Sequence, residues 1–133
     1  MTSPDSELRK HLQTIATANG LKIYDRVPEN EPGNFVYISD ITSADNFTAD
    51  QVIWETDLLL DIVTKVDTNT GGRKTADTIG NTLLTALINT YPTFTTYRIA
   101  KSTLLNMNYI DESTESGYII RKLIRISFEI ELL

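Results

Sequence analysis

The chain has 133 residues, no cysteine and a formal net charge of −6 at pH 7. This length is typical of one domain, spanning residues 1–133, that buries a hydrophobic core of its own. The missing cysteines exclude disulfides and thiolate metal sites, and the acidic balance argues against a surface built to grip nucleic-acid phosphates. The first ten residues contain no apolar segment and begin acidic, so we expect no signal peptide.

A helix is predicted at the start of the chain. Ser3 is placed to cap it, with Pro4 at the first helical position. Asn19 and Gly20 are expected to close it in left-handed geometry. Its apolar residues recur at helical spacing: Leu8, Leu12, Ile15 and Ala16. His11, the only histidine, lies beside this stripe and is interpreted as a surface or boundary residue rather than a ligand.

Two strands and a loop are expected next. Residues 21–27 alternate in a short strand, which Pro28 and the turn-rich residues 30–34 bring to an end. Residues 35–41 are mostly aromatic or β-branched, which favours a second strand. Residues 42–51 are almost entirely polar and are therefore predicted to form a surface loop.

The clearest pattern in the sequence is a long alternating strand over residues 52–66. Its even positions are all apolar or threonine: Val52, Trp54, Thr56, Leu58, Leu60, Ile62, Thr64 and Val66. A period of two is typical of a β-strand with one face on a core. Such a strand reaches about 50 Å, whereas a compact chain of this size is about 36 Å across. The strand therefore either bends at a bulge or projects as an arm that another subunit covers.

The second half of the chain is expected to contain a helix and a β-hairpin. After a glycine-containing turn at residues 67–72, the apolar residues from 73 to 89 keep helical spacing. Residues 98–110 and 118–132 are the two predicted strands of the hairpin, and a polar turn at residues 111–117 joins them.

Two polar details of this half bear on function. The segment GGRKT, residues 71–75, is only weakly similar to a phosphate-binding loop, because Arg73 interrupts the Gly-Lys-Thr order. We interpret it as a flexible turn. Lys122 interrupts the inner face of the last strand, which suggests that this end of the strand leaves the core.

The elements follow one another in the order α-β-β-β-α-β-β. Consecutive strands joined by short turns favour an α+β fold with an antiparallel sheet of about five strands. Both helices are then expected on the one apolar face of that sheet.

Three carboxylates form the one constellation that could support chemistry. Glu55, Asp57 and Asp61 share the outer face of the long strand, where neighbouring same-face positions lie about 7 Å apart. That spacing is too long for two of them to hold a divalent ion without a third ligand. A metal site or paired-carboxylate catalysis is the alternative; we favour a solvated face on which Arg121 and Arg125 are cross-strand partners. We predict no catalytic, cofactor-binding or metal-ligating residues.

The outer faces of the long strands also carry apolar residues: Ile53, Leu59, Val63, Ile119, Leu123 and Leu133. In a monomer these residues would be exposed to solvent and the strand edges would be unpaired, which soluble proteins avoid. We therefore expect an interaction protein. Its candidate interface residues are Glu55, Asp57, Leu59, Asp61, Arg121 and Arg125. Head-to-tail association of such subunits closes into a ring.

The layout of the chain resembles that of one protein family. Its components are the first helix, the short strand ending in Tyr24 to Pro28, the strand Phe35 to Ile41, the long alternating strand, the helix from Ala76 to Leu87 and the closing hairpin. This layout is similar to the tail completion or tail terminator proteins of long-tailed bacteriophages. The resemblance covers nearly the whole chain and implies a structural virion protein, not an enzyme, that needs no cofactor.

The resemblance also implies a ring, typically a hexamer, that caps the finished tail tube, stops its polymerisation and joins it to the head. Its partners would be further copies of itself, the tail tube protein and the head-tail connector proteins. It would reside at the head-proximal end of the virion tail after assembly in the host cytoplasm. DNA would pass through the lumen without specific binding, and an acidic wall would repel it.

Two alternatives stay open. One is a head-closure or neck connector protein, which would also act as a ring of identical subunits. The other is a small non-enzymatic ligand-binding α+β domain, which needs no second copy. Solution size helps to separate them, because the ligand-binding domain is expected to stay a monomer.

Overall fold

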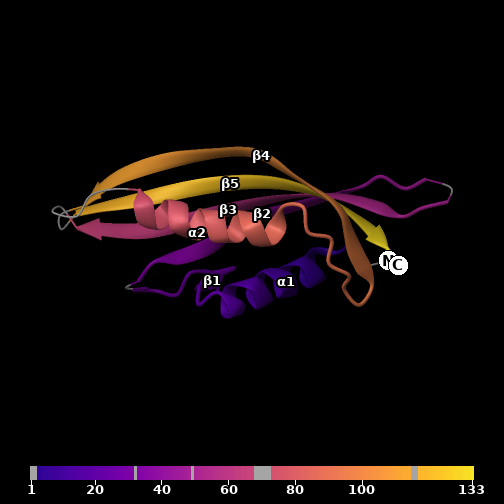
Figure 1. Ribbon diagram of the computed structural model, residues 1–133, viewed down its shortest axis with the longest axis horizontal. Helices are drawn as coiled ribbons and strands as arrows, with labels where there is room; N and C mark the ends of the chain where they lie inside the picture. Colours follow the sequence, from indigo (N-terminus) through magenta and orange to yellow (C-terminus); the bar gives the residue numbers. More distant parts are fainter. Residues whose placement is uncertain (1–2, 32, 49, 68–72, 115–116) are drawn as a thin grey trace.

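The computed structural model describes residues 3–31, 33–48, 50–67, 73–114 and 117–133, and Figure 1 shows its helices and strands. It confirms an α+β fold with the elements in the expected order. The elements are α1 (Asp5–Ala18), β1 (Ile23–Tyr24), β2 (Phe35–Asp45), β3 (Ile53–Asp67), α2 (Lys74–Leu87), β4 (Tyr97–Thr114) and β5 (Gly117–Leu132). In this part of the chain, neither helix is long and apolar enough to cross a membrane.

The five strands form one sheet in the order β1-β2-β3-β5-β4. All neighbouring pairs among the four long strands are antiparallel, as expected. β1 is the exception, because it pairs parallel to β2 through Ile23 opposite Val36. The chain re-enters the sheet at the same end, so β2 runs in the direction of β1.

β1 is shorter than the strand predicted over residues 21–27. The backbone N–H of Leu21 instead closes α1, by donating to the carbonyl of Ala16 at 2.8 Å. With Gly20 at a φ of +67°, this bond forms a helix cap in which left-handed geometry favours glycine. Asn19 has a φ of −109°, so only Gly20 adopts the predicted left-handed conformation.

The start of α1 differs from the prediction by one position. Pro4, not Ser3, occupies the N-cap position, and no described side chain caps the helix there. The carbonyl of Pro4 accepts a hydrogen bond from the N–H of Leu8 at 3.0 Å. Asp5 and Glu7 place negative charge in the first turn, where the helix dipole favours it.

Residues 42–45 belong to β2, which corrects the loop predicted over residues 42–51. Their antiparallel register with β3 continues to Asp45 opposite Trp54. Backbone pairing holds these residues in the sheet although most of their side chains are exposed. Because the residues are mostly polar, the sequence pattern does not indicate a strand here. β3 begins at Ile53, one residue later than expected.

The closing hairpin is confirmed and is longer than predicted. Residues 111–114 continue β4 opposite residues 117–120 of β5, whereas a turn was expected over residues 111–117. β4 also begins one residue early, at Tyr97. Of the turn predicted at residues 67–72, all but the first residue lies outside the described part of the chain.

β3 runs its whole length without a bulge. Its register with β5 is continuous from Ile53 to Asp67. Bulges occur instead in β2, between Ile38 and Asp40, and in β4. The β2–β3 hairpin consequently projects past both helices at one end of the molecule (Figure 1). The long strand thus projects, which was one of the two alternatives, and does not bend back at a bulge.

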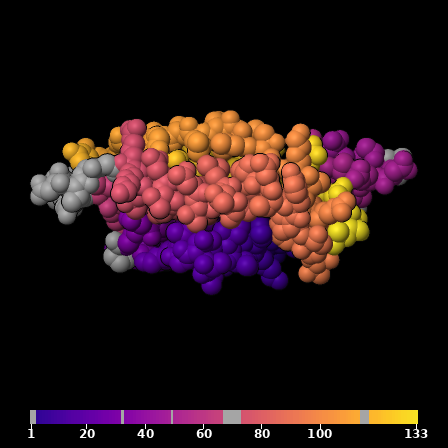
Figure 2. Space-filling model, in the orientation of Figure 1, coloured from indigo at the N-terminus to yellow at the C-terminus, as the bar shows by residue number. Residues whose placement is uncertain are grey.

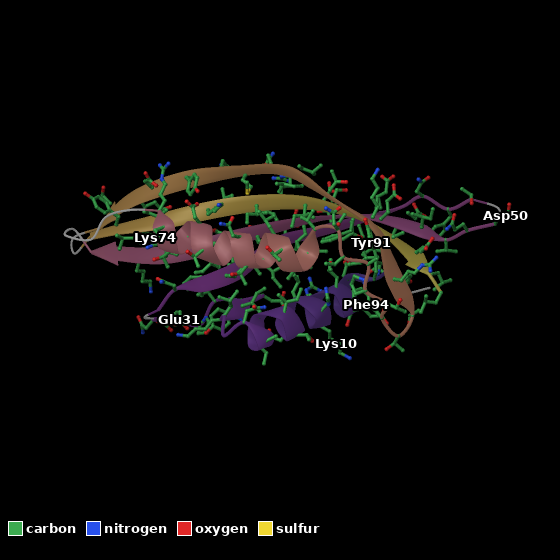
Figure 3. The ribbon with its side chains drawn as sticks, in the orientation of Figure 1. Lys10, Glu31, Asp50, Lys74, Tyr91 and Phe94 are labelled. Atoms are coloured by element: carbon green, nitrogen blue, oxygen red, sulfur yellow. The ribbon has the colours of Figure 1, made fainter. Side chains whose placement is uncertain are left out.

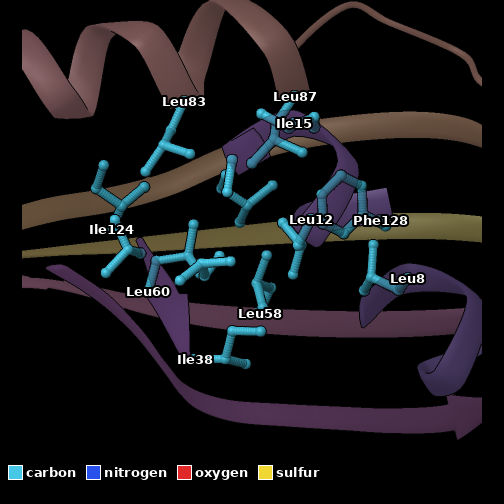
Figure 4. Packing of buried hydrophobic residues seen from close by; sticks show 14 of the residues in the cluster. Leu8, Leu12, Ile15, Ile38, Leu58, Leu60, Leu83, Leu87, Ile124 and Phe128 are labelled. Carbon is cyan, nitrogen blue, oxygen red and sulfur yellow. The ribbon is translucent and has the colours of Figure 1, made fainter. Parts of the chain in front are cut away.

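Both helices pack on one face of the sheet, as expected, and the hydrophobic core lies between them and the strands (Figure 4). α2, predicted over residues 73–89, is slightly shorter than expected. The core cluster includes Leu8, Leu12, Ile15, Leu58, Leu60, Leu83, Leu87, Ile124 and Phe128. Full burial of a side chain of this size stabilises the fold by about 1.5–3 kcal/mol. The even-numbered residues of β3 and β5 supply this core, which leaves their odd-numbered residues on the opposite, open face.

Candidate interaction surfaces

The open face of the sheet carries all six residues predicted for an interface. They are Glu55, Asp57, Leu59 and Asp61 on β3, and Arg121 and Arg125 on β5. Both helices lie on the other face, so no helix covers this surface.

Arg121 makes the most extensive polar contacts of the open face, as predicted for a cross-strand partner of the carboxylates. Its Nη2 lies 2.6 Å and its Nε 3.0 Å from Asp61 Oδ2. Its Nη1 lies 3.0 Å from Glu112 Oε1 on β4. Hydrogen bonding to Asp61 raises the pKa of Arg121. Asp61 is only 3% exposed, so its carboxylate is bound within the protomer and does not face a partner.

Several other charges of this face make no ion pair with a described residue. They are Glu55, Asp57, Arg125 and Glu129. Arg125 lies opposite Leu59, so Arg121 alone of the two predicted arginines forms an ion pair there. Glu55 lies directly opposite Glu129, and such a like-charge pair destabilises a sheet. Both glutamates line a shallow depression with Lys101, Thr103, Leu105 and Ser127.

The other residues considered for catalysis, metal binding or phosphate binding lie apart from one another. Within the described ranges, no three His, Asp or Glu side chains come close enough to hold a metal ion. The half-buried His11 packs its ring 5.2 Å from that of Phe94, and burial lowers the pKa of His11. Arg73 of the GGRKT segment pairs with Asp111 at 2.9 Å, and the two glycines of that segment lie outside the described residues.

A polar cluster between the first half of α2 and the sheet, built around the buried Lys122, was not predicted. Lys122 is 5% exposed and its Nζ lies 3.0 Å from Asp77 Oδ1, so this end of β5 stays under the helix and does not leave the core. The hydroxyl of Tyr109 also donates to Asp77, and these two bonds lower the pKa of Asp77. Gly80 makes room for the lysine, because a Cβ there would lie 3.2 Å from Lys122 Nζ. The sequence offers two signals of this cluster: a glycine inside a helix and a lysine on the inner face of the last strand.

A second polar cluster organises the chain before β2 (Figure 3). Glu31 accepts hydrogen bonds from Lys22 Nζ at 2.9 Å, from the hydroxyl of Tyr24 at 2.7 Å and from the N–H of Gly33 at 3.1 Å. These bonds, that from Lys22 foremost, lower the pKa of Glu31 to about 2. The cluster ties β1 to the start of β2 and so positions that side of the sheet.

The sheet has a long free edge along β4 (Figure 2). Thr93 bridges to Arg98 at the start of β4; beyond that point β4 pairs only with β5, and no described strand lies on its other side. Its exposed large apolar residues are Leu104, Leu105, Met107 and Ile110. On the opposite side of the sheet, β1 covers only Val36 and Tyr37 of β2, so residues 38–45 form a second free edge. Neither edge could be assigned from the sequence, because alternation within a strand does not give the order of the strands.

The projecting end of the β2–β3 hairpin carries an aromatic pair. Phe47 and Trp54 meet edge to face, with ring centroids 5.4 Å apart. Phe47 is 43% exposed, and Trp54 Nε1 is buried without a described partner. The tip of the molecule therefore presents apolar surface.

Comparisons with known proteins give a family match and structural neighbours among solved chains. The sequence profile described as tail completion protein gp17 matches residues 5–126. No curated protein matches the chain at a significant level. A chain in the solved virion of a native gene transfer agent particle has a similar fold, with a TM-score of 0.68 over 92% of this chain and 90% of that chain. At 17% identity, this similarity concerns the fold alone.

Proposed function

The chain belongs to the tail completion protein gp17 family, and from this membership we propose that it acts as one subunit of a ring, a hexamer, that caps the tail tube. The ring ends polymerisation of the tube and offers a docking surface to the head-tail connector proteins. Family membership itself gives the chain a structural role in phage tail completion. The proposed place of the ring is the head-proximal end of the virion tail, which it reaches after assembly in the host cytoplasm.

The observation that carries this proposal is the pair of free strand edges on opposite sides of one sheet. A monomer leaves the free edges of β4 and β2 open to solvent, with the four exposed apolar residues of β4 beside them. Soluble proteins protect such edges, because unpaired strands associate. A closed ring of identical subunits protects every edge, and head-to-tail contacts are the kind that close into rings.

The charges of the open face support a second part of the proposal, that this face lines the lumen. Glu55 and Asp57 are exposed there and have no ion-pair partner among the described residues. A wall of such carboxylates repels DNA and lets it pass without being bound. Asp61 and Arg121 are bound to each other, so Leu59 and Arg125 are the remaining interface candidates that are free to meet a partner.

A non-enzymatic role follows from the same assignment, since a cap works by shape and contact. The direct test mixes the purified chain with its tail tube protein and measures tube length by electron microscopy. Light scattering on the chain alone gives its mass. The expected result is a ring of about six copies and tubes that stop growing when it is added. A chain that stays monomeric and leaves tube growth unchanged would overturn the proposal, and binding to connector proteins alone would assign the chain to the neck.

A further inference from the structure

The free edges of β4 and β2 are compatible in strand direction and in the faces on which their residues lie. We propose that β4 of one copy pairs with residues 38–45 of β2 in the next copy, so that the sheet continues across the seam between subunits. This inference rests on the ring proposed above and names the surfaces that form it. The occupant of the β4 edge is thus a second copy of this chain.

The direction of the strands permits this pairing without turning a subunit over. β2, β3, β5 and β4 alternate in direction across the sheet. β4 therefore runs opposite to β2, and a neighbour in the same orientation presents its β2 antiparallel to β4. Both helices of every copy then stay on one side of the extended sheet, and the open faces stay together on the other.

The register within the sheet shows which residues lie level at the two edges. One row runs from Ile41 through Leu58 and Ile126 to Leu104, on the helix-covered face. The next row on the open face runs from Thr42 through Asp57 and Ser127 to Thr103. In a seam without offset, Leu104 therefore meets Ile41 of the next copy and Thr103 meets its Thr42. Closure of a sheet into a ring adds a stagger, which must be even to keep apolar side chains on their own face.

The charges at the two edges are complementary. The exposed Lys101 of β4 makes no ion pair with a described residue. It lies level with Ala44 of β2, on the open face. The exposed Asp40 lies on the same face and the same free edge, four residues away, so an even stagger brings it towards Lys101. A two-fold pairing of β4 with itself would leave the β2 edge and Asp40 uncovered, so the head-to-tail seam accounts for more of the surface.

Disulfide trapping tests the seam sharply, because the chain has no cysteine of its own. The variant Thr42→Cys is mixed in turn with Lys101→Cys, Thr103→Cys, Asn106→Cys or Leu104→Cys, and each mixture is oxidised mildly. Linked heterodimers are expected with one of the three open-face positions of β4, at least tenfold above the background. Leu104→Cys is the matched control, since its side chain lies on the opposite face and should not link to Cys at position 42.

Light scattering on the same samples separates the two proposals. If rings form but Thr42→Cys links to none of the open-face positions, the seam is wrong while the ring stands. If the β4 variants link to themselves instead, the edge pairs by a two-fold axis and the head-to-tail seam is overturned. If the protein stays monomeric at every concentration and no link forms, the ring proposal fails together with the seam.

Discussion

Arg121 on β5 holds Asp61 on β3 with two hydrogen bonds to one carboxylate oxygen, at 2.6 and 3.0 Å. The same guanidinium reaches Glu112 on β4, so a single side chain connects three neighbouring strands. Asp61 is almost fully buried by this contact, although it lies on the open face. The pair therefore contributes to the stability of the protomer by joining these strands on the open face.

Removing Arg121 should leave a buried carboxylate without its donor. We expect Arg121→Gln to lower the free energy of unfolding by about 2 kcal/mol, the cost of stranding a buried charged acceptor. Glu112→Gln, the matched control on the exposed side of the same arginine, should cost less than about 1 kcal/mol. Urea denaturation measures both. Asp61→Asn added to Arg121→Gln should recover part of the loss, and equal small effects of all the variants would contradict this account.

Gly80 should behave unlike an ordinary helix glycine, because Lys122 occupies the space beside it. Gly→Ala inside a helix normally stabilises by about 1 kcal/mol. A Cβ at position 80 would lie 3.2 Å from Cδ, Cε and Nζ of Lys122, so Gly80→Ala should give no gain in the native chain. In a Lys122→Ala background the gain of about 1 kcal/mol should return.

The control for this double-mutant cycle is Asn81→Ala, on the exposed face of α2. It should have the same effect with and without Lys122, since its side chain does not face the lysine. Thermal and urea unfolding of the four proteins in each cycle give the coupling energy. A Gly80→Ala gain that is independent of residue 122 would show that the lysine is not what keeps a glycine there.

The two long strands β3 and β5 could be predicted from the sequence because each has one face on the core. The ends of β2 and β4 could not, since residues 42–45 and 111–114 are polar and are held mainly by backbone pairing. The contact between Asp61 and Arg121 was within reach of sequence reasoning, which placed both on one sheet face. Contacts that depend on where a helix crosses the sheet, such as Lys122 with Asp77, are absent from the pattern of either element alone.

Stability in acid should depend on Glu31. Hydrogen bonds from Lys22, Tyr24 and Gly33 lower the pKa of Glu31 from 4.5 to about 2. A lowered carboxyl pKa contributes stability that is complete above pH 4.5 and is lost as the pH falls towards 2. We therefore expect Glu31→Gln to be less stable than the native chain at neutral pH, with the difference shrinking over this interval. Glu29→Gln, an exposed neighbour, is the control, and a difference constant from pH 5 to about 2 would contradict the prediction.

Reversing the charge of the open face should turn a DNA-repelling surface into one that binds DNA. Glu55→Lys with Asp57→Lys replaces two exposed carboxylates and changes the net charge from −6 to −2, because two charges of −1 become +1. Fluorescence anisotropy with a duplex at low salt should show no binding by the native ring and salt-sensitive binding by this variant. Asp25→Lys with Glu29→Lys makes the same change in net charge in the segment between β1 and β2, outside the strands of the open face, and should bind far more weakly. Equal DNA binding by the two variants would mean that the open face does not line the lumen.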